Sequence, residues 1–261
     1  MLHGSRHLLF ACLALHLALG CGAEEAHAGR IELSILAASS LTEAFQELAQ
    51  TFEQAHPEID VSLVFAGSQV LRLQIEQGAG VDLYASANEA HMRSLQSIGL
   101  VSDSHTFAHN ELVVIAPKSH THFRRFADLA HARRVVLGTD RVPIGIYARQ
   151  VLERSERKLG PAFASQVRRH IVSEEGNVRL VRAKIELGEA DAALVYRTDA
   201  TATAKVRMVP IPAELNVRAN YAIGLASSSA QADAARAFIA FALAHAGQQT
   251  LRRHGFVTDG P

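Results

Sequence analysis

Cysteine is nearly absent from this sequence. Its two cysteines, Cys12 and Cys21, both lie before residue 29, so the body of the chain after that point has no thiol. Disulfides, cysteine-ligated zinc and catalysis by a thiol are therefore excluded for that body. Internal repeats, low-complexity tracts and long linkers are also missing, so two lobes would have to be joined by crossing strands and not by a flexible tether.

An excess of charge of either sign is missing too. Lys plus Arg (26) equals Asp plus Glu (26), which gives a formal net charge of zero and argues against a nucleic-acid binder, since such proteins usually carry a basic excess. Of the 261 residues, 48% are hydrophobic and 20% are charged. This balance predicts a soluble globular body with one large domain or two modest ones.

The apolar run "LLFACLALHLALG" (Leu8–Gly20) is too short to span a bilayer comfortably. Arg6 and His7 precede it, and the small residues "AHA" (Ala26–Ala28) follow in the arrangement expected before a signal-peptidase cut. Residues 1–28 are therefore expected to be a signal peptide, cleaved after Ala28, and the protein is expected in the periplasm.

A lipid anchor is the alternative interpretation of the same segment. "ALGC" (Ala18–Cys21) resembles a bacterial lipoprotein cleavage site, which would leave a lipidated Cys21 as the first residue. The match is imperfect, because Ala18 stands where leucine is usual and Leu19 where a small residue is usual. Soluble export is the favoured expectation of the two.

Buried-strand patterns alternate with helix-period segments along the rest of the chain. Strands are predicted over residues 31–38, 60–67, 81–86, 111–117, 133–139, 192–198, 206–212 and 221–226. The main helical patterns cover residues 41–52, 68–78, 144–157, 178–187 and 231–254. This alternation predicts an α/β fold with mostly parallel sheets.

Ligands of open α/β sheets bind at the carboxyl ends of the strands, where helices begin. Two such turns carry serines. "AASSLTE" places Ser40 as a helix N-cap with Glu43 three residues later, a capping-box pattern. "FAGSQVL" ends a strand and starts a helix, which makes Ser68 the natural cap.

Two further turns offer backbone amides. "GTDRVPIG" puts Pro143 at a first helical position, so the amides of Ile144 and Gly145 are unpaired at a helix start. "SEEGNVRL" has Asn177 as the cap and Val178 as the residue that opens the helix.

Each helix N-terminus has spare N–H donors and about half a positive charge, which suits an anion. Several of them aimed at one point would hold a dianion without any lysine or arginine. A single capping serine, however, is ordinarily only a cap. Spacing alone does not show whether the four turns converge.

From Ile31 to Phe256 the chain resembles the periplasmic molybdate-binding proteins of ABC importers. Any one of the motifs would be weak, whereas their order and separations together are specific. The motifs are "AASSLTEAF", "FAGSQVLRLQIEQGAGVDLYASA", "NELVVIAP", "VPIGIYARQVLE", "GNVRLVRAKIELGEADAALVYRTDA" and "RRHGF".

Carried over by position, the resemblance implies five oxyanion ligands. Ser40 and Ser68 would contribute hydroxyl and amide groups, Ile144 and Val178 backbone amides, and Tyr196 its phenol. Tyr196 does not follow from the turns, and without the resemblance it would equally be a buried aromatic at a strand end. Ile144 is bulkier than the residue expected in some relatives, which is expected to narrow the pocket without removing an amide contact.

The resemblance also implies a two-lobed periplasmic-binding-protein fold of type II, with a mostly parallel sheet flanked by helices in each lobe. Residues 29–110 and 221–261 would form the first lobe and residues 111–220 the second. Two crossing strands would join the lobes, with Asn110 and Asn220 near the hinges.

The function implied is capture of molybdate, with tungstate expected as well, followed by hinge closure and delivery to an ABC permease. No enzymatic activity, no cofactor and no nucleic-acid partner is expected, and a monomer is expected. Molybdate has acceptors only, so a site made of donors suits it, whereas the O–H of a protonated phosphate would lack an acceptor at a cost of about 1–3 kcal/mol. Another tetrahedral oxyanion, such as sulfate, is the alternative ligand.

An enzyme is a weaker alternative. "AGSQV" is not the G-x-S-x-G elbow of serine hydrolases, and "GTDRVPIG" lacks the Gly-Lys-Ser/Thr ending of a Walker loop. The adjacent acids Glu174 and Glu175 are interpreted as solvated loop charges.

Metal binding is the other alternative. His105, His109, His120 and His122 cluster in sequence, but no carboxylates stand at a recognisable ligand spacing beside them. Surface histidines are the favoured interpretation.

Overall fold

The computed structural model describes residues 29–259. The predicted signal peptide, its cleavage after Ala28 and the alternative anchor at Cys21 lie outside the described residues. Between residues 29 and 259, none of the helices combines the length and the apolar character needed to cross a bilayer.

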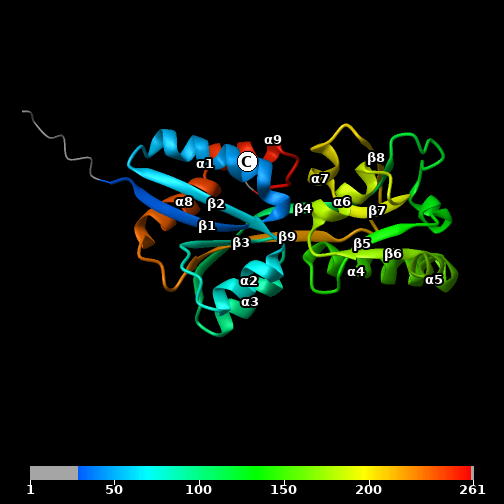
Figure 1. Cartoon of the computed structure of the whole chain (residues 1–261), viewed down its shortest axis with the longest axis horizontal. Coiled ribbons are helices and arrows are strands. Elements are labelled where there is room, and N and C mark those ends of the chain that lie inside the picture. Colours follow the sequence, from blue (N-terminus) through cyan, green and yellow to red (C-terminus); the bar gives the residue numbers. More distant parts are fainter. Residues whose placement is uncertain (1–28, 260–261) are drawn as a thin grey trace, which may run out of the picture.

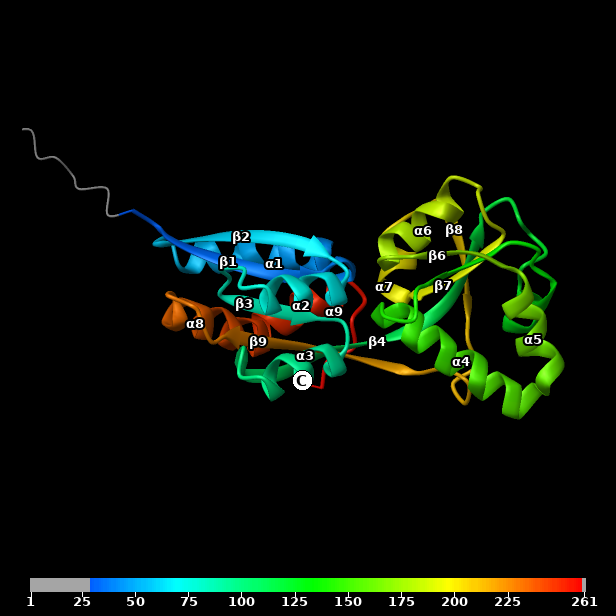
Figure 2. The ribbon, with the colours of Figure 1, turned by 60° about the horizontal axis from the view of Figure 1, so that its bottom comes forward.

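Two lobes lie side by side, joined by two long strands (Figures 1 and 2). We call the half that contains β1 the first lobe. Its strands are β1 (Ile31–Ala38), β2 (Ile59–Ala66) and β3 (Leu83–Ser86). Its helices are the short 3-10 turn η1 (Ser39–Leu41), α1 (Thr42–Ala55), α2 (Ser68–Glu76), α3 (Glu89–Ser97) and, from the end of the chain, α8 (Ala232–Leu243) and α9 (His245–Arg253).

The second lobe is formed by the middle of the chain. Its strands are β5 (Val135–Gly138), β6 (Ile171–Glu175), β7 (Ala192–Tyr196) and β8 (Val206–Pro210). Its helices are η2 (Phe126–His131), α4 (Pro143–Leu159), α5 (Pro161–Arg169), α6 (Val178–Glu186) and α7 (Arg197–Thr201).

The crossing strands are β4 (Val101–Pro117) and β9 (Arg218–Ala226). In the described part of the chain, the strand order is β2-β1-β3-β9-β4-β7-β5-β6, with β8 paired to β4 beside this path. β4 pairs with β9 as far as Glu111 and with β7 and β8 from Leu112 and Val113 onward. The predicted lobe boundaries at 110/111 and 220/221 fall inside these two strands and stay a prediction.

The α/β prediction is confirmed, and the directions of the strands refine it. β1 is parallel to both β2 and β3, and β5 is parallel to both β6 and β7. β4 and β9 run antiparallel to their neighbours. Each lobe therefore has a parallel centre, while the sheet as a whole is mixed.

The elements that differ from the sequence-based expectation include β4, β6 and the helix predicted over residues 231–254. β4 begins at Val101 and not near Glu111, because its first half, "VSDSHTFAHN", is too polar to show an apolar run. β6 was not predicted, since its burial alternates along "IVSEE" and only β5 pairs with it. The predicted helix over residues 231–254 is two helices, because Ala244 is extended (φ −73°, ψ 167°).

The helical periodicity after β1 buries the predicted apolar face of α1, including Phe45 and Phe52. Their rings pack against Phe238 of α8, with centroids 6.1 Å and 5.1 Å away. Burying each such ring contributes about 1.5–3 kcal/mol. This packing fixes the start of α1, and hence Ser40, relative to the sheet.

Candidate functional site

A small pocket lies between the two lobes, where strands end and helices begin. It brings together all five residues named from the resemblance. Its lining comprises Ala38, Ser39, Ser40, Ala66, Gly67, Ser68 and Ala87 from the first lobe, and Val142, Pro143, Ile144, Asn177, Val178 and Tyr196 from the second. The four turns therefore converge, which spacing alone did not show.

Ser40 is not the helix cap that the sequence predicted. β1 runs into the η1 turn, whose N-cap is Ala38, and α1 then starts at Thr42 with Leu41 as its N-cap. Neither cap makes a side-chain hydrogen bond. The prediction of a capping box formed by Ser40 and Glu43 is therefore wrong. The extra turn leaves the buried Ser40 hydroxyl free to lie at the pocket.

Ser68 is the first residue of α2 and not its cap. The cap is Gly67, and it makes no side-chain hydrogen bond. The Ser68 hydroxyl instead accepts a hydrogen bond from the backbone N–H of Ala87 at 3.1 Å. Its carbonyl oxygen accepts one from the hydroxyl of Tyr84 at 2.8 Å. The carbonyl group and the hydroxyl of Ser68 are thus held by β3 and by the turn that follows it. These contacts fix the hydroxyl beside the pocket.

The prediction of a helix start with Pro143 in the first turn is confirmed, with Val142 as the N-cap of α4. By position, the N–H groups of Ile144 and Gly145 have no partner within the helix. Gly145 is required there, because an added Cβ would lie 2.0 Å from the carbonyl oxygen of Thr139. Because of this close approach, the N-terminus of α4 packs directly against the end of β5.

The prediction that Asn177 caps α6 is also confirmed. Its side-chain oxygen accepts the N–H of Leu180 at 3.1 Å. Val178 is then the first helical residue, and its side chain is 3% exposed. Its amide, like that of Ile144, belongs to the first turn and has no intrahelical acceptor.

Tyr196 ends β7, and 1% of it is exposed. Among the described residues, its buried hydroxyl has no hydrogen-bond partner. Burial raises the pKa of this phenol well above its usual value, so the hydroxyl is neutral and keeps its proton. Because an unpaired buried hydroxyl costs about 1–3 kcal/mol, its retention indicates a role other than stability.

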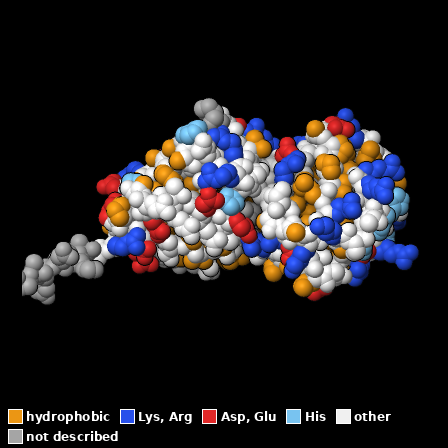
Figure 3. Space-filling model, turned by 90° about the horizontal axis from the view of Figure 1, so that it is seen from above, with side chains coloured by type: hydrophobic (Ala, Val, Ile, Leu, Met, Phe, Trp, Pro, Cys, Tyr) orange, Lys and Arg blue, Asp and Glu red, His pale blue; other side chains and the backbone are white. Residues whose placement is uncertain are grey.

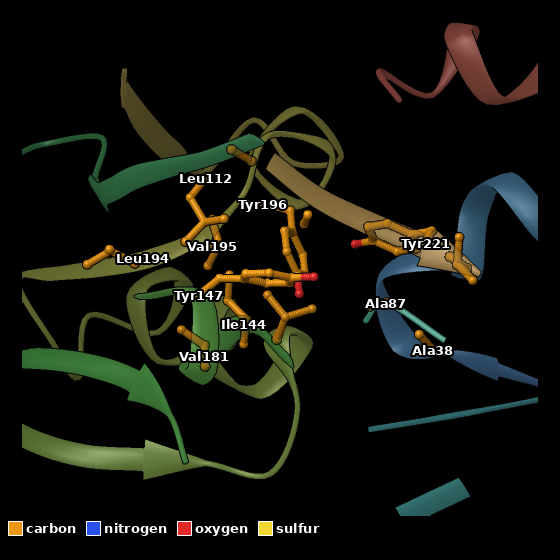
Figure 4. Close-up of a cluster of buried hydrophobic side chains, with 14 of the residues drawn as sticks. Ala38, Ala87, Leu112, Ile144, Tyr147, Val181, Leu194, Val195, Tyr196 and Tyr221 are labelled. Carbon is orange, nitrogen blue, oxygen red and sulfur yellow. The ribbon is translucent and has the colours of Figure 1, made fainter. Parts of the chain in front are cut away.

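Three tyrosines meet beside the pocket (Figure 4). The ring of Tyr196 lies edge-on to Tyr147 of α4 at 6.4 Å and tilted at 66° to Tyr221 of β9 at 5.7 Å. Tyr221 donates a hydrogen bond to the Ser40 hydroxyl at 2.9 Å. Sequence reasoning missed Tyr221, because nothing near it in the sequence marks a turn or a cap.

The described residues that line the pocket include neither lysine nor arginine. An ion pair joins Glu43 on α1 of the first lobe to Arg179 on α6 of the second, at 2.7 Å. Figure 3 shows basic and acidic side chains interspersed on the face it presents, including both sides of the boundary between the lobes. The polar groups of the pocket itself are therefore hydroxyls and amides.

Two further polar contacts join the lobes around the pocket. The side-chain amide of Gln69 on α2 donates to the carbonyl oxygen of Gly176 at 2.8 Å. The Nε2 atom of His91 on α3 lies 3.0 Å from the carbonyl oxygen of Arg141. Together with the Glu43–Arg179 pair, these contacts hold the lobes against each other.

The alternative site residues lie elsewhere. His109 contacts Asp259 at 2.6 Å and Asn220 at 2.8 Å. Within residues 29–259, no three His, Cys, Asp or Glu side chains are grouped to hold a metal ion. Glu174 pairs with Arg149 of α4, outside the pocket lining.

Two lobes joined by crossing strands, with a pocket of uncharged donors between them, form the arrangement of a solute-binding protein. The family model of the bacterial extracellular solute-binding proteins matches residues 33–257, and this chain belongs to that family.

Curated relatives agree with this assignment. The chain is 36% identical over 235 residues to the molybdate-binding protein ModA of Mycobacterium tuberculosis strain H37Rv, covering 87% of this chain and 85% of that protein. It is 30% identical over 259 residues to the molybdate-binding protein ModA of Escherichia coli K12, covering 95% and 96%. The periplasmic molybdate-binding protein of Azotobacter vinelandii, at 20% identity, shares the fold with a TM-score of 0.77 over 87% of this chain and 100% of that one.

Proposed function

We propose that this protein binds molybdate, and also tungstate, in the pocket between its lobes and hands it to an ABC permease. The observation that carries the proposal is the convergence of Ser40, Ser68, Ile144, Val178 and Tyr196 on one pocket without a lysine or arginine. Relatives named as molybdate-binding proteins support the choice of ligand.

The roles follow from the donors that each residue offers. Ser40 and Ser68 donate through hydroxyl and amide groups, and Tyr196 donates its unpaired phenolic proton. Ile144 and Val178 contribute first-turn amides, which also bring the positive ends of α4 and α6 to the anion. An anion with acceptors only satisfies all of these donors.

The same donors disfavour a phosphate that carries a proton. Its O–H would enter a buried site without an acceptor, at a cost of about 1–3 kcal/mol, or about ten- to a hundredfold in affinity. Sulfate carries no proton, so only its smaller size separates it from molybdate.

Binding is coupled to closure in this proposal. Ser40 and Ser68 lie in the first lobe and the other three ligands in the second, so a bridging anion favours the closed arrangement by its differential affinity. The hinges lie in β4 and β9 near Asn110 and Asn220, between lobes formed by residues 29–110 with 221–261 and by residues 111–220. The protein works as a periplasmic monomer without a cofactor, exported by residues 1–28.

Isothermal titration calorimetry of the purified protein with molybdate, tungstate, sulfate and phosphate tests the proposal. We expect submicromolar binding of the first two anions and no detectable binding of phosphate. Tight binding of sulfate together with weak binding of molybdate would overturn the assignment and leave a sulfate-type protein.

A further inference from the structure

Tyr221 lies on the crossing strand β9 and contacts Ser40 of the pocket lining, although the two residues are far apart in the chain. It is fully buried, and its ring packs edge-on against Phe107 at 6.4 Å and Phe256 at 5.2 Å. Its hydroxyl oxygen lies 2.9 Å from the Ser40 hydroxyl oxygen. The packing holds the ring, so the phenol approaches Ser40 from a fixed direction.

The surroundings determine which hydroxyl donates. The Asn110 side-chain oxygen accepts the N–H of Glu111 at 3.0 Å, and its NH₂ group donates to Thr198 at 2.9 Å. Burial raises the pKa of Tyr221 well above its usual value, so its hydroxyl keeps the proton. Because the Asn110 oxygen is already engaged by Glu111, the Tyr221 proton is donated to the Ser40 hydroxyl.

A serine hydroxyl has one proton and two lone pairs. Because Tyr221 occupies one lone pair of Ser40, the Ser40 proton points away from Tyr221, and the pocket between the lobes is one place where it can meet an acceptor. Ser68 is committed in the same way, but by the backbone N–H of Ala87. Of the two serine hydroxyls, the one of Ser40 is therefore the one oriented by a side chain. A substitution at Tyr221 can remove that orienting group.

We infer that Tyr221 is a specificity-determining positioning residue, which commits the Ser40 hydroxyl to donate into the pocket and so excludes oxyanions that carry a proton, such as hydrogenphosphate and hydrogenarsenate. This inference rests on the proposed function. Without the phenol, the Ser40 proton can rotate to the side that Tyr221 occupies. A lone pair then faces the pocket and can accept the O–H of such an anion.

The test is Tyr221→Phe in the full protein, titrated with molybdate, sulfate, phosphate and arsenate at pH 7. We expect molybdate affinity to fall by about threefold to tenfold and phosphate and arsenate affinity to rise by about tenfold or more. The ratio of molybdate to sulfate affinity stays as in the wild type, because neither anion carries a proton.

Tyr84→Phe is the matched control. It removes another fully buried tyrosine hydroxyl beside a site serine, but that hydroxyl donates to the carbonyl oxygen of Ser68 and not to its hydroxyl. We expect this variant to weaken all the anions by a common factor and to keep phosphate excluded. Ser40→Ala, which leaves neither a side-chain donor nor a side-chain acceptor, should weaken molybdate binding without admitting phosphate.

The outcomes separate the inference from the proposed function. If the wild type fails to bind molybdate, the proposed function falls, and the inference falls with it. If the wild type binds molybdate but Tyr221→Phe still excludes phosphate and arsenate, the inference alone is overturned. If Tyr221→Phe shows no cooperative thermal transition, Tyr221→Leu, which also lacks the donor, replaces it. The same two outcomes then apply to that variant.

Discussion

Gly67 at the end of β2 faces the carbonyl oxygen of Gly176 across the cleft, with no room between them for a side chain. A Cβ added to Gly67 would lie 2.4 Å from that oxygen. The backbone of Gly67 (φ −64°, ψ 137°) is open to any residue. The glycine is therefore needed for the approach of the lobes and not for the conformation of the turn.

Gly67→Ala should hold the lobes apart and weaken molybdate binding by about tenfold or more, because relieving such an overlap typically costs about 1–3 kcal/mol. Calorimetry measures the change. Gly176→Ala is the matched control on the opposite side of the same cleft, since a Cβ there would meet nothing within 4 Å. Equal effects of the two substitutions would contradict the proposed closure.

Tyr196→Phe tests the phenol as a ligand. Its hydroxyl has no protein partner in the described chain, so the variant should be as stable as the wild type without ligand, or slightly more stable. Molybdate affinity should fall by about tenfold, for about 1–2 kcal/mol of lost hydrogen bonding. Thermal melts with and without molybdate measure both quantities, and an unchanged ligand-induced shift would return Tyr196 to a packing role.

The pair of Glu43 and Arg179 can be tested by a double-mutant cycle with Glu43→Gln and Arg179→Gln. Both side chains are partly exposed, at 40% and 34%, so their coupling should contribute only about 0.2–1 kcal/mol to molybdate binding and decrease with salt. The control cycle uses Arg72 and Glu76, which pair within α2. No coupling to binding is expected there, and coupling of equal size in both cycles would exclude a specific interlobe role.

Asp199 is expected to make the stability of the protein depend on pH. Burial raises the pKa of its carboxyl from 3.8 to about 7, although Arg182 lowers it. Between these values the folded protein holds a proton that the unfolded chain has released, so the free energy of unfolding falls as pH rises through this window and then levels off. The total is about 4 kcal/mol at most.

Asp199→Asn should remove that slope and make the protein more stable than the wild type at pH 8. Denaturant unfolding at pH 5 and pH 8 measures it. Asp233→Asn, at the exposed start of α8, should keep the wild-type slope. A wild-type slope in Asp199→Asn would show that another group carries the pH dependence.

Local chemistry was sufficient to predict part of this molecule. The strand β1, the buried face of α1, the Pro143 helix start and the Asn177 cap each depend on a few neighbouring residues, and each agrees with the sequence-based expectation. The two serines were misread as caps because their hydroxyls are engaged by Tyr221 and by the turn after β3. Those partners are distant in the sequence and leave no local pattern.

The site was predicted by a different route. The turns indicated where anion donors lie, but only the resemblance to a family joined them into one site and added Tyr196. Tyr221 and the Gly67–Gly176 approach were accessible by neither route, because each depends on how distant segments meet at the cleft. Whether the five lining residues bind an oxyanion stays a prediction.

The position of β9 between β3 and β4 has a consequence for synthesis of the chain. Until β9, α8 and α9 have been made, the sheet of the first lobe lacks one of its inner strands, and α1 lacks the helices against which it packs. Contacts of such sequence separation form slowly. A half-made chain therefore holds Ser40 and Ser68 on an unfinished scaffold, and the pocket that they line is complete only once α8 and α9 have formed.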